Sequence, residues 1–223
     1  MPERKQTPKG KLAVTVWQYK GGVGKTTISL VLAEIAAQNG LNVLAVDLDE
    51  QRNLYETLKL TGSSFSTLNV VTYLDSSFAD DNYDFYVIDT HPSKDETIKS
   101  ALAFADIVLI PVFGDYNSVI NLRSVFDFAV SAGVGAGQIA IVKNCMTPFK
   151  VSTETESMLD EQRYPSAGRL PGSNILIRNI ATGLVWDKGM RDSQKEPFYK
   201  LYSKIWRAFE KMQNGNFFNI WSD

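Results

Sequence analysis

Residues 20–27 read Lys-Gly-Gly-Val-Gly-Lys-Thr-Thr, a combination of residue types that suits a phosphate group. Glycines can take positive φ and bring backbone N–H groups close to phosphate oxygens. Within this segment Lys25 can supply a positive charge to the β- and γ-phosphates, and the Thr26 hydroxyl can ligate Mg²⁺. The segment is therefore predicted to bind a nucleoside triphosphate together with Mg²⁺.

The loop departs from the usual pattern G-x-x-x-x-G-K-[ST] at its first position. Tyr19 stands where that pattern has glycine, and Lys20 adds a second lysine at the head of the loop. The flanking segments have the required character, because an apolar run precedes the loop and a helical pattern follows it. This context favours a deviant phosphate-binding loop over a glycine-rich turn that binds nothing.

Two further apolar runs end in carboxylates. Residues 42–49 end in Asp47 and Asp49, and residues 84–90 carry Asp89 near their end. Because the carboxyl ends of parallel strands meet at one edge of a sheet, we expect these carboxylates to lie beside the phosphate-binding loop. A carboxylate in such a place can also cap a helix or form a turn, and the pattern alone leaves that structural role open for Asp89.

Strand-like and helical patterns alternate along the chain. This alternation predicts an α/β fold of the P-loop NTPase type, with a doubly wound, mostly parallel sheet and helices on both faces. The predicted strands are residues 12–17, 42–47, 84–89, 106–112 and 138–144. The predicted helices fill much of residues 25–39, 53–60, 95–104, 116–131, 152–163 and 196–213. Residues 61–82 show the weakest pattern, and residues 132–137 are predicted to form a loop.

The length and composition favour one globular domain. The chain has 223 residues, of which 44% are hydrophobic, enough for a sizeable core. We predict a flexible basic lead-in at residues 1–11, a single P-loop domain at residues 12–213 and a C-terminal tail at residues 214–223. The 23 Lys and Arg residues nearly balance the 25 Asp and Glu residues, so binding to a polyanion would require local clustering of charge.

Several classes of protein are disfavoured by what the sequence contains. The single cysteine, Cys145, cannot form an intramolecular disulfide, and it argues against a cysteine-ligated iron–sulfur cluster. No apolar run approaches the roughly 18 residues that a membrane span needs. The basic N-terminal residues lack the apolar segment of a signal peptide. A cytoplasmic protein is therefore expected.

Taken together, the motifs resemble the ParA/MinD family of deviant Walker A P-loop ATPases. The resemblance rests on residues 20–27, on Asp47-Leu-Asp-Glu-Gln51 and on Ile88-Asp-Thr90, and it extends from about residue 12 to about residue 205. It is strongest toward small ParA-type DNA partition proteins, which lack an N-terminal helix-turn-helix domain. Because only about ten residues precede the first predicted strand, we expect no such domain here.

The resemblance implies ATP and Mg²⁺ as cofactors and assigns residues to each. The residues that it implies for ATP are Lys20, Gly21, Gly22, Val23, Gly24, Lys25, Thr26, Thr27 and Asn144. Those that it implies for Mg²⁺ are Thr26, Asp89 and Asp49.

The resemblance also implies catalytic roles. Lys20 would reach across an ATP-sandwiched homodimer to the partner's nucleotide, Asp49 would orient the attacking water, and Asp47 would shape the same segment. Two residues depart from the family's pattern. Glu50 stands where the family usually has proline, and His91 stands where a proline or another small residue is common. These departures concern the rate of hydrolysis and the rigidity of the two segments, not nucleotide binding.

The last predicted helix carries a basic stripe. Lys200, Lys204, Arg207 and Lys211 recur at i, i+4, i+7 and i+11, beside an apolar stripe. Such a stripe can neutralise DNA phosphates without reading bases, and the resemblance to DNA-binding ParA proteins favours that role. A solvated face of an amphipathic helix is the alternative.

The tail that follows is aromatic but not basic. Phe217, Phe218, Ile220 and Trp221 invite comparison with a membrane-targeting helix, which is amphipathic and basic. Because no Lys or Arg follows Lys211, we expect this tail to dock on the protein's own body or on a partner, and membrane binding is disfavoured.

The implied function is an ATP-dependent, dimerising partition ATPase. It would bind non-specific DNA, associate with the nucleoid and segregate or position plasmid or chromosomal cargo. A ParB-like or cargo-adaptor protein would stimulate its slow hydrolysis of ATP. Two alternatives stay open: a relative that positions another cargo (a protein compartment, a receptor array or a membrane-associated division factor), and a metabolic P-loop ligase. Lys20, and the lack of any motif for a small carboxylic substrate, disfavour the ligase.

Overall fold

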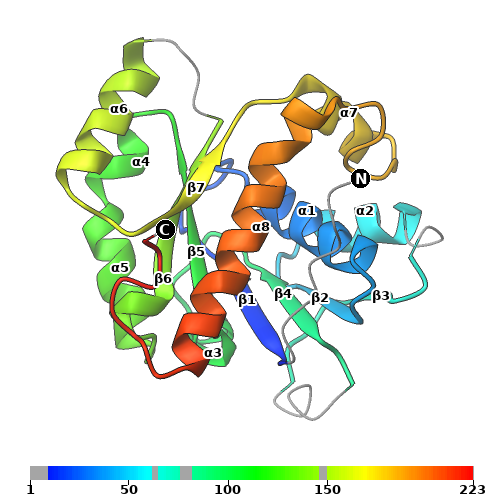
Figure 1. Cartoon of the computed structure of the whole chain (residues 1–223), viewed down its shortest axis with the longest axis horizontal. Coiled ribbons are helices and arrows are strands. Elements are labelled where there is room, and N and C mark those ends of the chain that lie inside the picture. The colour runs from blue at the N-terminus through cyan, green and yellow to red at the C-terminus, as the bar shows by residue number, and fades with distance from the viewer. Residues whose placement is uncertain (1–9, 62–64, 76–81, 146–149, 223) are drawn as a thin grey trace.

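The computed structural model describes residues 10–61, 65–75, 82–145 and 150–222. Within these ranges a seven-stranded sheet runs through the molecule in the order β3-β2-β4-β1-β5-β6-β7, and every strand pair is parallel (Figure 1). The strands are β1 (Leu12–Val16), β2 (Val43–Asp47), β3 (Leu68–Val71), β4 (Phe85–Asp89), β5 (Ile107–Phe113), β6 (Ile139–Asn144) and β7 (Ser166–Leu170).

Helices cover both faces of the sheet. On one face α1, α2, α7 and α8 contribute apolar side chains to the largest buried cluster, and on the other face α3, α4, α5 and α6 pack. The helices are α1 (Lys25–Gln38), α2 (Asn53–Thr61), α3 (Glu96–Phe104), α4 (Asn117–Ile120), α5 (Leu122–Ser131), α6 (Lys150–Glu161), α7 (Asn174–Ala181) and α8 (Asp192–Gln213). The predicted doubly wound α/β fold is therefore confirmed.

The strand sequences explain why both faces are covered. In β5, Leu109 packs into the α1/α8 layer, whereas Val108 and Ile110 pack into the opposite layer. Successive side chains of a strand point to opposite faces, so a continuous apolar run needs helices on both sides. The central strands β1, β2 and β4 are buried along their whole length, as their continuous apolar sequences require.

The topology brings the polar strand ends together. β1 lies between β4 and β5, so the chain leaves β1 at the point where the strand order reverses. In open parallel sheets, ligands bind outside the carboxyl ends of the strands at such a switch point. The loops after β1, β2, β4, β5 and β6 all open at this edge, and they carry the residues singled out in the sequence.

The sequence pattern missed three elements, two edge strands and one short helix. The first is β3, whose sequence Leu-Asn-Val-Val is half-exposed at a sheet edge inside residues 61–82. The second is β7, which contains Gly168 and Arg169 and forms the opposite edge. The third is α7, a short helix that the Ser173 hydroxyl caps by accepting from the Leu176 N–H at 3.2 Å. Edge strands bury less apolar surface, so their sequences carry less periodicity.

Two predicted helices have different limits in the structure. Residues 116–131 form α4 and α5, which meet at Asn121. The last helix begins at Asp192 and not at residue 196, because the Gln194 side chain caps its first turn by accepting from the Arg191 N–H at 2.9 Å. Pro197 therefore lies inside α8.

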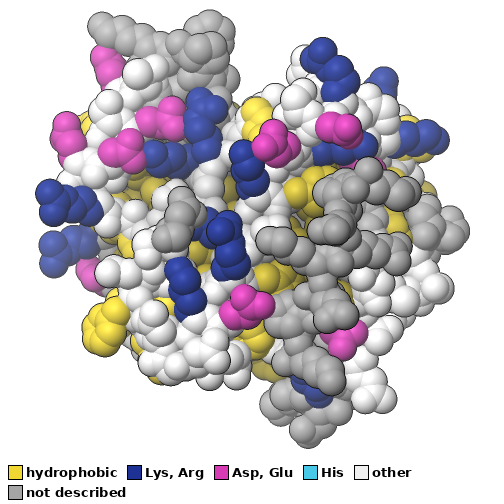
Figure 2. Space-filling model, viewed as in Figure 1, with side chains coloured by type: hydrophobic (Ala, Val, Ile, Leu, Met, Phe, Trp, Pro, Cys, Tyr) yellow, Lys and Arg dark blue, Asp and Glu magenta, His cyan; other side chains and the backbone are white. Residues whose placement is uncertain are grey.

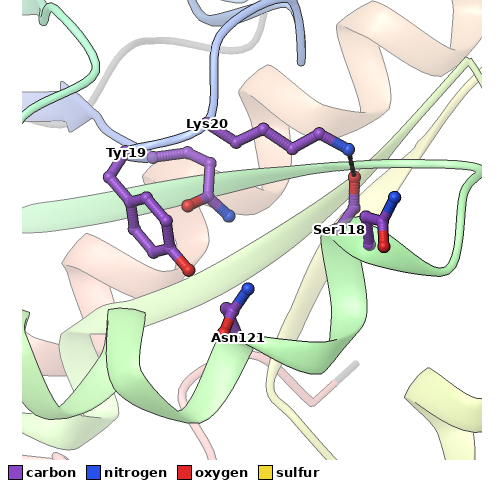
Figure 3. Close-up of a pocket in the computed structure, with 6 residues that line it drawn as sticks. Tyr19, Lys20, Ser118 and Asn121 are labelled. Atoms are coloured by element: carbon purple, nitrogen blue, oxygen red, sulfur yellow. Dashed lines mark hydrogen bonds between the residues drawn. The ribbon is translucent and has the colours of Figure 1, made fainter.

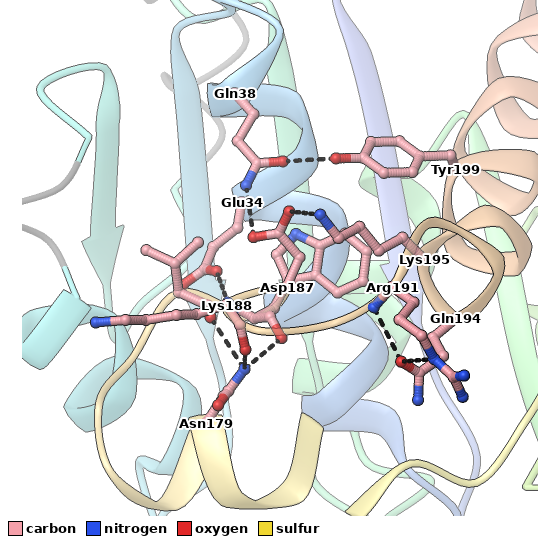
Figure 4. Close-up of polar contacts among 11 residues, drawn as sticks. Glu34, Gln38, Asn179, Asp187, Lys188, Arg191, Gln194, Lys195 and Tyr199 are labelled. Carbon is pink, nitrogen blue, oxygen red and sulfur yellow. Dashed lines mark hydrogen bonds and ion pairs between the residues drawn. The ribbon is translucent and has the colours of Figure 1, made fainter. Parts of the chain in front are cut away.

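A buried polar network fixes the loop between α7 and α8 onto α1. The Asn179 amide donates to the backbone carbonyls of Trp186 and Lys188, both at 2.9 Å, and Glu34 accepts from the Trp186 N–H at 2.7 Å. Asn179 and Glu34 are fully buried. Figure 4 shows the Asn179 amide pointing into this loop beneath Glu34 of α1. The network joins segments that lie far apart in the sequence.

The C-terminal tail packs on the protein's own body, one of the two placements expected from the sequence. Ile220 and Trp221 are buried, and the indole N–H of Trp221 donates to the Gly137 carbonyl at 2.8 Å. Phe217 and Phe218 stay exposed. The predicted lead-in, apart from Gly10 and Lys11, falls outside the described residues.

Candidate functional site

The phosphate-binding loop connects β1 to α1 and is shaped by two glycines. Gly22 and Gly24 have φ of 74° and 94°, a backbone region that residues other than glycine rarely adopt. Gly24 is also the N-cap of α1, and a Cβ there would collide with the side-chain amide of Asn144. Gly21 does not take a positive φ. The loop leaves the N-terminal end of α1 facing the space where phosphates would lie.

Lys25 begins α1 and has a buried side chain. Its ammonium donates to the backbone carbonyl of Lys20 at 3.2 Å. Burial lowers the pKa of Lys25 below its ordinary value, although the charges of Asp89 and Asp49 oppose that shift. A phosphate group beside this ammonium would supply the negative charge that the buried cation lacks.

Asp89 ends β4 and is fully buried. One carboxylate oxygen accepts from the Ser29 hydroxyl at 3.2 Å, and the Thr26 hydroxyl also contacts this carboxylate. The other oxygen, Oδ2, has no hydrogen-bond partner among the described residues. Burial raises the pKa of Asp89 to about 7, against the opposing effects of Thr26, Lys25 and Ser29.

This arrangement fits a hard divalent cation. A buried carboxylate oxygen without a partner and an adjacent threonine hydroxyl are the donor types that Mg²⁺ prefers. A cation would supply the positive charge that favours the ionised form of Asp89. No group of three or more His, Cys, Asp or Glu side chains able to hold a metal occurs in the described part of the chain. Phosphate oxygens and water would therefore have to complete the coordination.

Asp47 and Asp49 have different hydrogen-bond partners. The buried Asp47 accepts from the backbone N–H groups of Asp49 at 3.0 Å and Tyr55 at 2.8 Å, so it fixes the loop after β2 and the first turn of α2. Burial raises the pKa of Asp47. Asp49 lies half-exposed in the same loop and accepts from the Gln51 N–H at 2.9 Å. Asp47 is thus a loop-shaping residue, and Asp49 is the one placed to meet water.

Lys20 points away from the phosphate-binding loop. Its ammonium contacts Asp115 Oδ1 and Oδ2 at 2.7 and 2.9 Å and the Ser118 hydroxyl at 3.0 Å. Figure 3 shows the Lys20 side chain extending toward Ser118 above a cavity. That cavity has a volume of about 280 Å³, and it is lined by Gln18, Tyr19, Lys20, Asn117, Ser118 and Asn121.

Burial and the contacts with Lys20 and Ser118 shift the pKa of Asp115 in opposite directions. Burial by itself would raise the pKa of Asp115, but the contacts with Lys20 and Ser118 outweigh it and hold that pKa below its ordinary value. Asp115 is therefore an ionised partner of Lys20. No motif in the sequence predicts this role for Asp115.

His91 links two loops of the site. Its Nδ1 lies 2.9 Å from the Leu48 carbonyl, and its Nε2 lies 2.6 Å from Asp95 Oδ2. A carbonyl and a carboxylate only accept hydrogen bonds, so this geometry requires both ring nitrogens to donate. Burial would lower the pKa of His91, but the bonds to Asp95 and Leu48 outweigh it and raise that pKa above its ordinary value. The residue at this atypical position thus ties the β4–α3 loop to the loop that carries Asp49.

Asn144 ends β6 and contacts the phosphate-binding loop directly. Its amide donates to the Val23 carbonyl at 2.8 Å, and its side chain is buried. This places Asn144 beside Gly24, at the same sheet edge as Asp89. Its Oδ1 stays available as an acceptor, the group that a base amine would need.

The basic stripe lies on the outer face of α8, far along the chain from the phosphate-binding loop. Lys200 is paired with Glu196 at 2.8 Å, and Lys211 donates to the Ser222 carbonyl at 2.6 Å. Arg207 is exposed. Figure 2 shows several basic side chains over α8, with acidic side chains near them. The charge of the stripe is thus partly offset at its N-terminal end.

Three contact residues of the site escaped the sequence reasoning: Ser29, Asp115 and Ser118. Ser29 stands four residues after Lys25, so the helical period could have placed it on the same face of α1. Asp115 and Ser118 follow β5 and carry no motif. Only the folded chain brings them to Lys20, across 95 and 98 residues of sequence.

The sequence matches one protein-family model over most of its length. The CobQ/CobB/MinD/ParA nucleotide binding domain matches residues 14–184. The chromosome-partitioning ATPase Soj of Thermus thermophilus is 30% identical over 137 residues, covering 46% of this chain and 55% of Soj. An uncharacterised protein of Methanocaldococcus jannaschii is 24% identical over 166 residues, covering 52% of this chain and 64% of that protein. The matches thus span less than two thirds of either relative.

Solved structures share the fold. The cell-division protein MinD of Aquifex aeolicus has a TM-score of 0.74 at 18% identity, with 87% of this chain and 96% of MinD covered. A McdA variant of Cyanothece, in an ATP complex, has a TM-score of 0.71 at 17% identity, with 88% and 96% covered. A plasmid partition protein of Borrelia burgdorferi has a TM-score of 0.64 at 21% identity, with 87% and 97% covered. At these identities the likeness concerns the fold.

The family model covers more than half of the chain, and the residues that it spans include the end of β1, the phosphate-binding loop, Asp89 and Asn144. The chain therefore belongs to the CobQ/CobB/MinD/ParA nucleotide-binding family.

Proposed function

We propose that this protein is a Mg²⁺-dependent ATPase that dimerises around ATP, binds duplex DNA without sequence preference and positions a genetic cargo. The observation that carries the proposal is the phosphate-binding loop with two lysines beside a buried Asp89 that has one carboxylate oxygen without a partner. The similarity to Soj, which is described as a chromosome-partitioning ATPase, supports the choice of cargo. Such a protein would work in the cytoplasm on the nucleoid.

The residues of the site would bind and orient ATP in separate ways. Backbone N–H groups of residues 21–27 and the N-terminal end of α1 would hold the phosphates, with Lys25 turning from the Lys20 carbonyl to the β- and γ-phosphates. Thr26 and Asp89 would hold Mg²⁺, and Asp49 would help to orient a water molecule beside that ion. The cation would neutralise charge on the phosphate oxygens. Asn144 would present its free acceptor to the adenine amine.

Hydrolysis would then depend on Asp49 and on a second copy of the chain. Asp49 is half-exposed in the loop after β2, held in place by Asp47 and by the link from His91 to Leu48. It would orient the attacking water. Lys20 of a second copy would offset charge that develops on the transferring phosphoryl oxygens. A ParB-like or cargo-adaptor protein would accelerate this step.

DNA binding would use the basic stripe on α8. The stripe faces outward and carries no aromatic residue, so it would contact backbone phosphates and not bases. The Glu196 carboxylate beside Lys200 weakens the field at one end. We therefore expect the contacts to centre on Lys204, Arg207 and Lys211.

A second candidate function keeps the same ATPase and changes the cargo. MinD, McdA and plasmid partition proteins all share the fold of this chain, with TM-scores between 0.64 and 0.74, so the fold does not select a cargo, and a protein compartment or a division factor is an alternative. No helix in the described ranges has both the length and the apolar character to cross a bilayer. The exposed pair Phe217 and Phe218 is the feature that would favour an adaptor protein or an interfacial role.

The decisive experiment is binding to an arbitrary-sequence DNA duplex in three states: with ATP and Mg²⁺, with ADP and Mg²⁺, and without nucleotide. We expect salt-sensitive binding only with ATP and Mg²⁺. Absence of binding in every state, combined with normal ATP hydrolysis, would reject the DNA cargo and favour the second candidate. Absence of ATP binding would reject both.

A further inference from the structure

The ammonium of Lys20 has no donor left in this structure. It carries three N–H groups, and three acceptor atoms surround it: both carboxylate oxygens of Asp115 and the Ser118 hydroxyl, all within 3.0 Å. The two side chains of the ion pair are about one third exposed, at 35% for Lys20 and 34% for Asp115. Lys20 is thus held by its own chain on the side of β5, and it is not directed at a phosphate.

Asp115 is built to hold this position. It lies between the end of β5 and the start of α4, and Oδ1 accepts from the Ser118 N–H at 3.0 Å while Oδ2 accepts from the Ser118 hydroxyl at 2.9 Å. These bonds fix the carboxylate before Lys20 arrives. An acceptor fixed in advance loses little conformational entropy when it binds the ammonium.

The backbone of Lys20 is held as well. The Lys25 ammonium donates to the Lys20 carbonyl at 3.2 Å. Phosphates bound in the loop would compete for the same ammonium, since a phosphate oxygen is a stronger acceptor than a neutral carbonyl. Nucleotide binding would therefore break the hydrogen bond from the Lys25 ammonium to the Lys20 carbonyl, but it would leave the ion pair between Lys20 and Asp115 intact.

We propose that Asp115 and Ser118 form a latch that holds Lys20 in its own subunit and sets the threshold for dimerisation around ATP. The inference rests on the proposed function, in which Lys20 acts on the nucleotide of a second copy. Lys20 cannot donate to both the latch and a second subunit's phosphates, so each subunit must open its latch when the dimer forms. Asp115 is a positioning residue that acts through Lys20 and does not touch the nucleotide.

Local turn formation is the alternative role for Asp115, and the test must separate the two. Asp115→Asn keeps an amide oxygen that can accept from the Ser118 N–H, but it removes the charge that holds Lys20. Ser118→Ala removes one neutral partner of Lys20 and leaves Asp115 charged. Glu96→Gln is the matched control, because it removes the charge of another exposed ion pair, Lys99–Glu96 on α3, in which neither Lys20 nor Asp115 takes part.

The measurement is the monomer–dimer dissociation constant by sedimentation velocity, with a non-hydrolysable ATP analogue and Mg²⁺. An exposed ion pair contributes up to about fivefold per subunit, and two latches open per dimer, so Asp115→Asn is expected to tighten the dimer by about twofold to 25-fold. Ser118→Ala should tighten it less, and Glu96→Gln should leave it unchanged. Affinity of the monomer for the analogue should not change in any of them.

If the latch acts through Lys20, the effect of Asp115→Asn on dimerisation should require Lys20. In a Lys20→Ala background, Asp115→Asn should have no effect on dimerisation, because no latch remains to open. If Lys20→Ala abolishes the dimer and Asp115→Asn leaves the dissociation constant unchanged or raises it, the latch is wrong and the proposed function stands. If Lys20→Ala dimerises as the wild type does, Lys20 adds nothing to the dimer and the latch is wrong, while the proposed role of Lys20 in hydrolysis stands. If the wild-type chain forms no dimer with the analogue, the proposed function and the latch both fail.

Discussion

Asp47 and Asp89 end neighbouring strands in the same register, and the backbone N–H of the next residue, Leu48, donates to the Asp89 carbonyl at 2.9 Å. The two carboxylates nevertheless have different surroundings. Asp47 accepts two backbone N–H groups, whereas Asp89 keeps one oxygen without a partner among the described residues. The loop after β2 is thus held by Asp47, whereas the end of β4 presents a carboxylate oxygen without a partner among the described residues, and Asp49 lies half-exposed beside them.

Asp49→Ala should stop turnover while leaving ATP binding and dimerisation in place. The Asp49 carboxylate makes one local hydrogen bond, to the Gln51 N–H, so its loss removes water orientation and little structure. We expect phosphate release to fall by about 100-fold or more, the scale of a lost general base or water-positioning group. Glu56→Ala, an exposed acid in α2, is the control and should behave as wild type. Loss of the dimer in Asp49→Ala would show that Asp49 also builds the interface.

Lys25→Ala should abolish ATP binding. The ammonium is buried at the start of α1 beside the space for the phosphates, and truncating a buried charged partner costs at least about 2 kcal/mol, or about 30-fold in affinity. Titration with a fluorescent ATP analogue measures the effect, and Lys59→Ala, an exposed lysine of α2, serves as the control. An unchanged affinity would overturn the assignment of the phosphate-binding loop.

Replacing the basic stripe on α8 by alanine should weaken DNA binding equally for all sequences. Each lost phosphate contact should reduce the slope of log K against log salt by about 0.9. The control variant replaces four exposed basic residues on other elements: Lys59, Arg123, Arg163 and Lys188. Equal losses in both variants would mean that general charge, and not the stripe, binds DNA.

His91 should make the stability of the two linked loops depend on pH. Its pKa is raised in the folded state, so its contribution is complete below about 6.5 and is lost as the pH rises through the folded value. Asp95, whose pKa is lowered to about 2 by its bonds to His91, the Ile98 N–H and Ser93, contributes above 3.8 and loses that contribution as the pH falls toward 2. The link is therefore strongest between about pH 4 and pH 6.5.

His91→Gln tests this pH dependence. Because Asp95 is half-exposed, solvent screening limits the expected loss to below about 1 kcal/mol at pH 6, with a smaller loss at pH 9. Urea unfolding at the two pH values measures the difference. His91 is the chain's single histidine, so its ring signals can be titrated directly by NMR. A ring pKa at or below 6.5 would contradict the geometry in which both nitrogens donate.

Asn179→Ala should destabilise the fold without touching the site. It removes the amide that satisfies the Trp186 and Lys188 carbonyls, and buried acceptors left without partners cost about 1–3 kcal/mol each. We expect a fall of about 2–4 kcal/mol in the free energy of unfolding. Asn174→Ala, at an exposed position of the same helix, should change it little. A wild-type stability would mean that water replaces the amide.

The central strands and most helices were predictable because their signals are local. Strands β1, β2, β4 and β5 are buried on both faces and read as continuous apolar runs, and the glycine and lysine pattern of residues 20–27 has few other uses. The edge strands β3 and β7 were not predicted, because half-exposed strands keep polar residues and glycine. The start of α8 depends on a hydrogen bond from the Arg191 N–H to the Gln194 side chain, and hydrophobic periodicity carries no information about such a cap.

The sequence by itself determined the family fold, the phosphate-binding loop and the identity of the carboxylates at the strand ends, because each follows from residue type and spacing along the chain. Only the tertiary structure decided what those side chains touch. In the folded chain the Asp47 carboxylate accepts from backbone N–H groups, and one Asp89 oxygen has no partner among the described residues. Lys20 forms an ion pair with Asp115. Hydrogen bonds are short and directional, so partners that lie 95 residues apart are chosen by the packing of β1 against β5 and not by any local pattern.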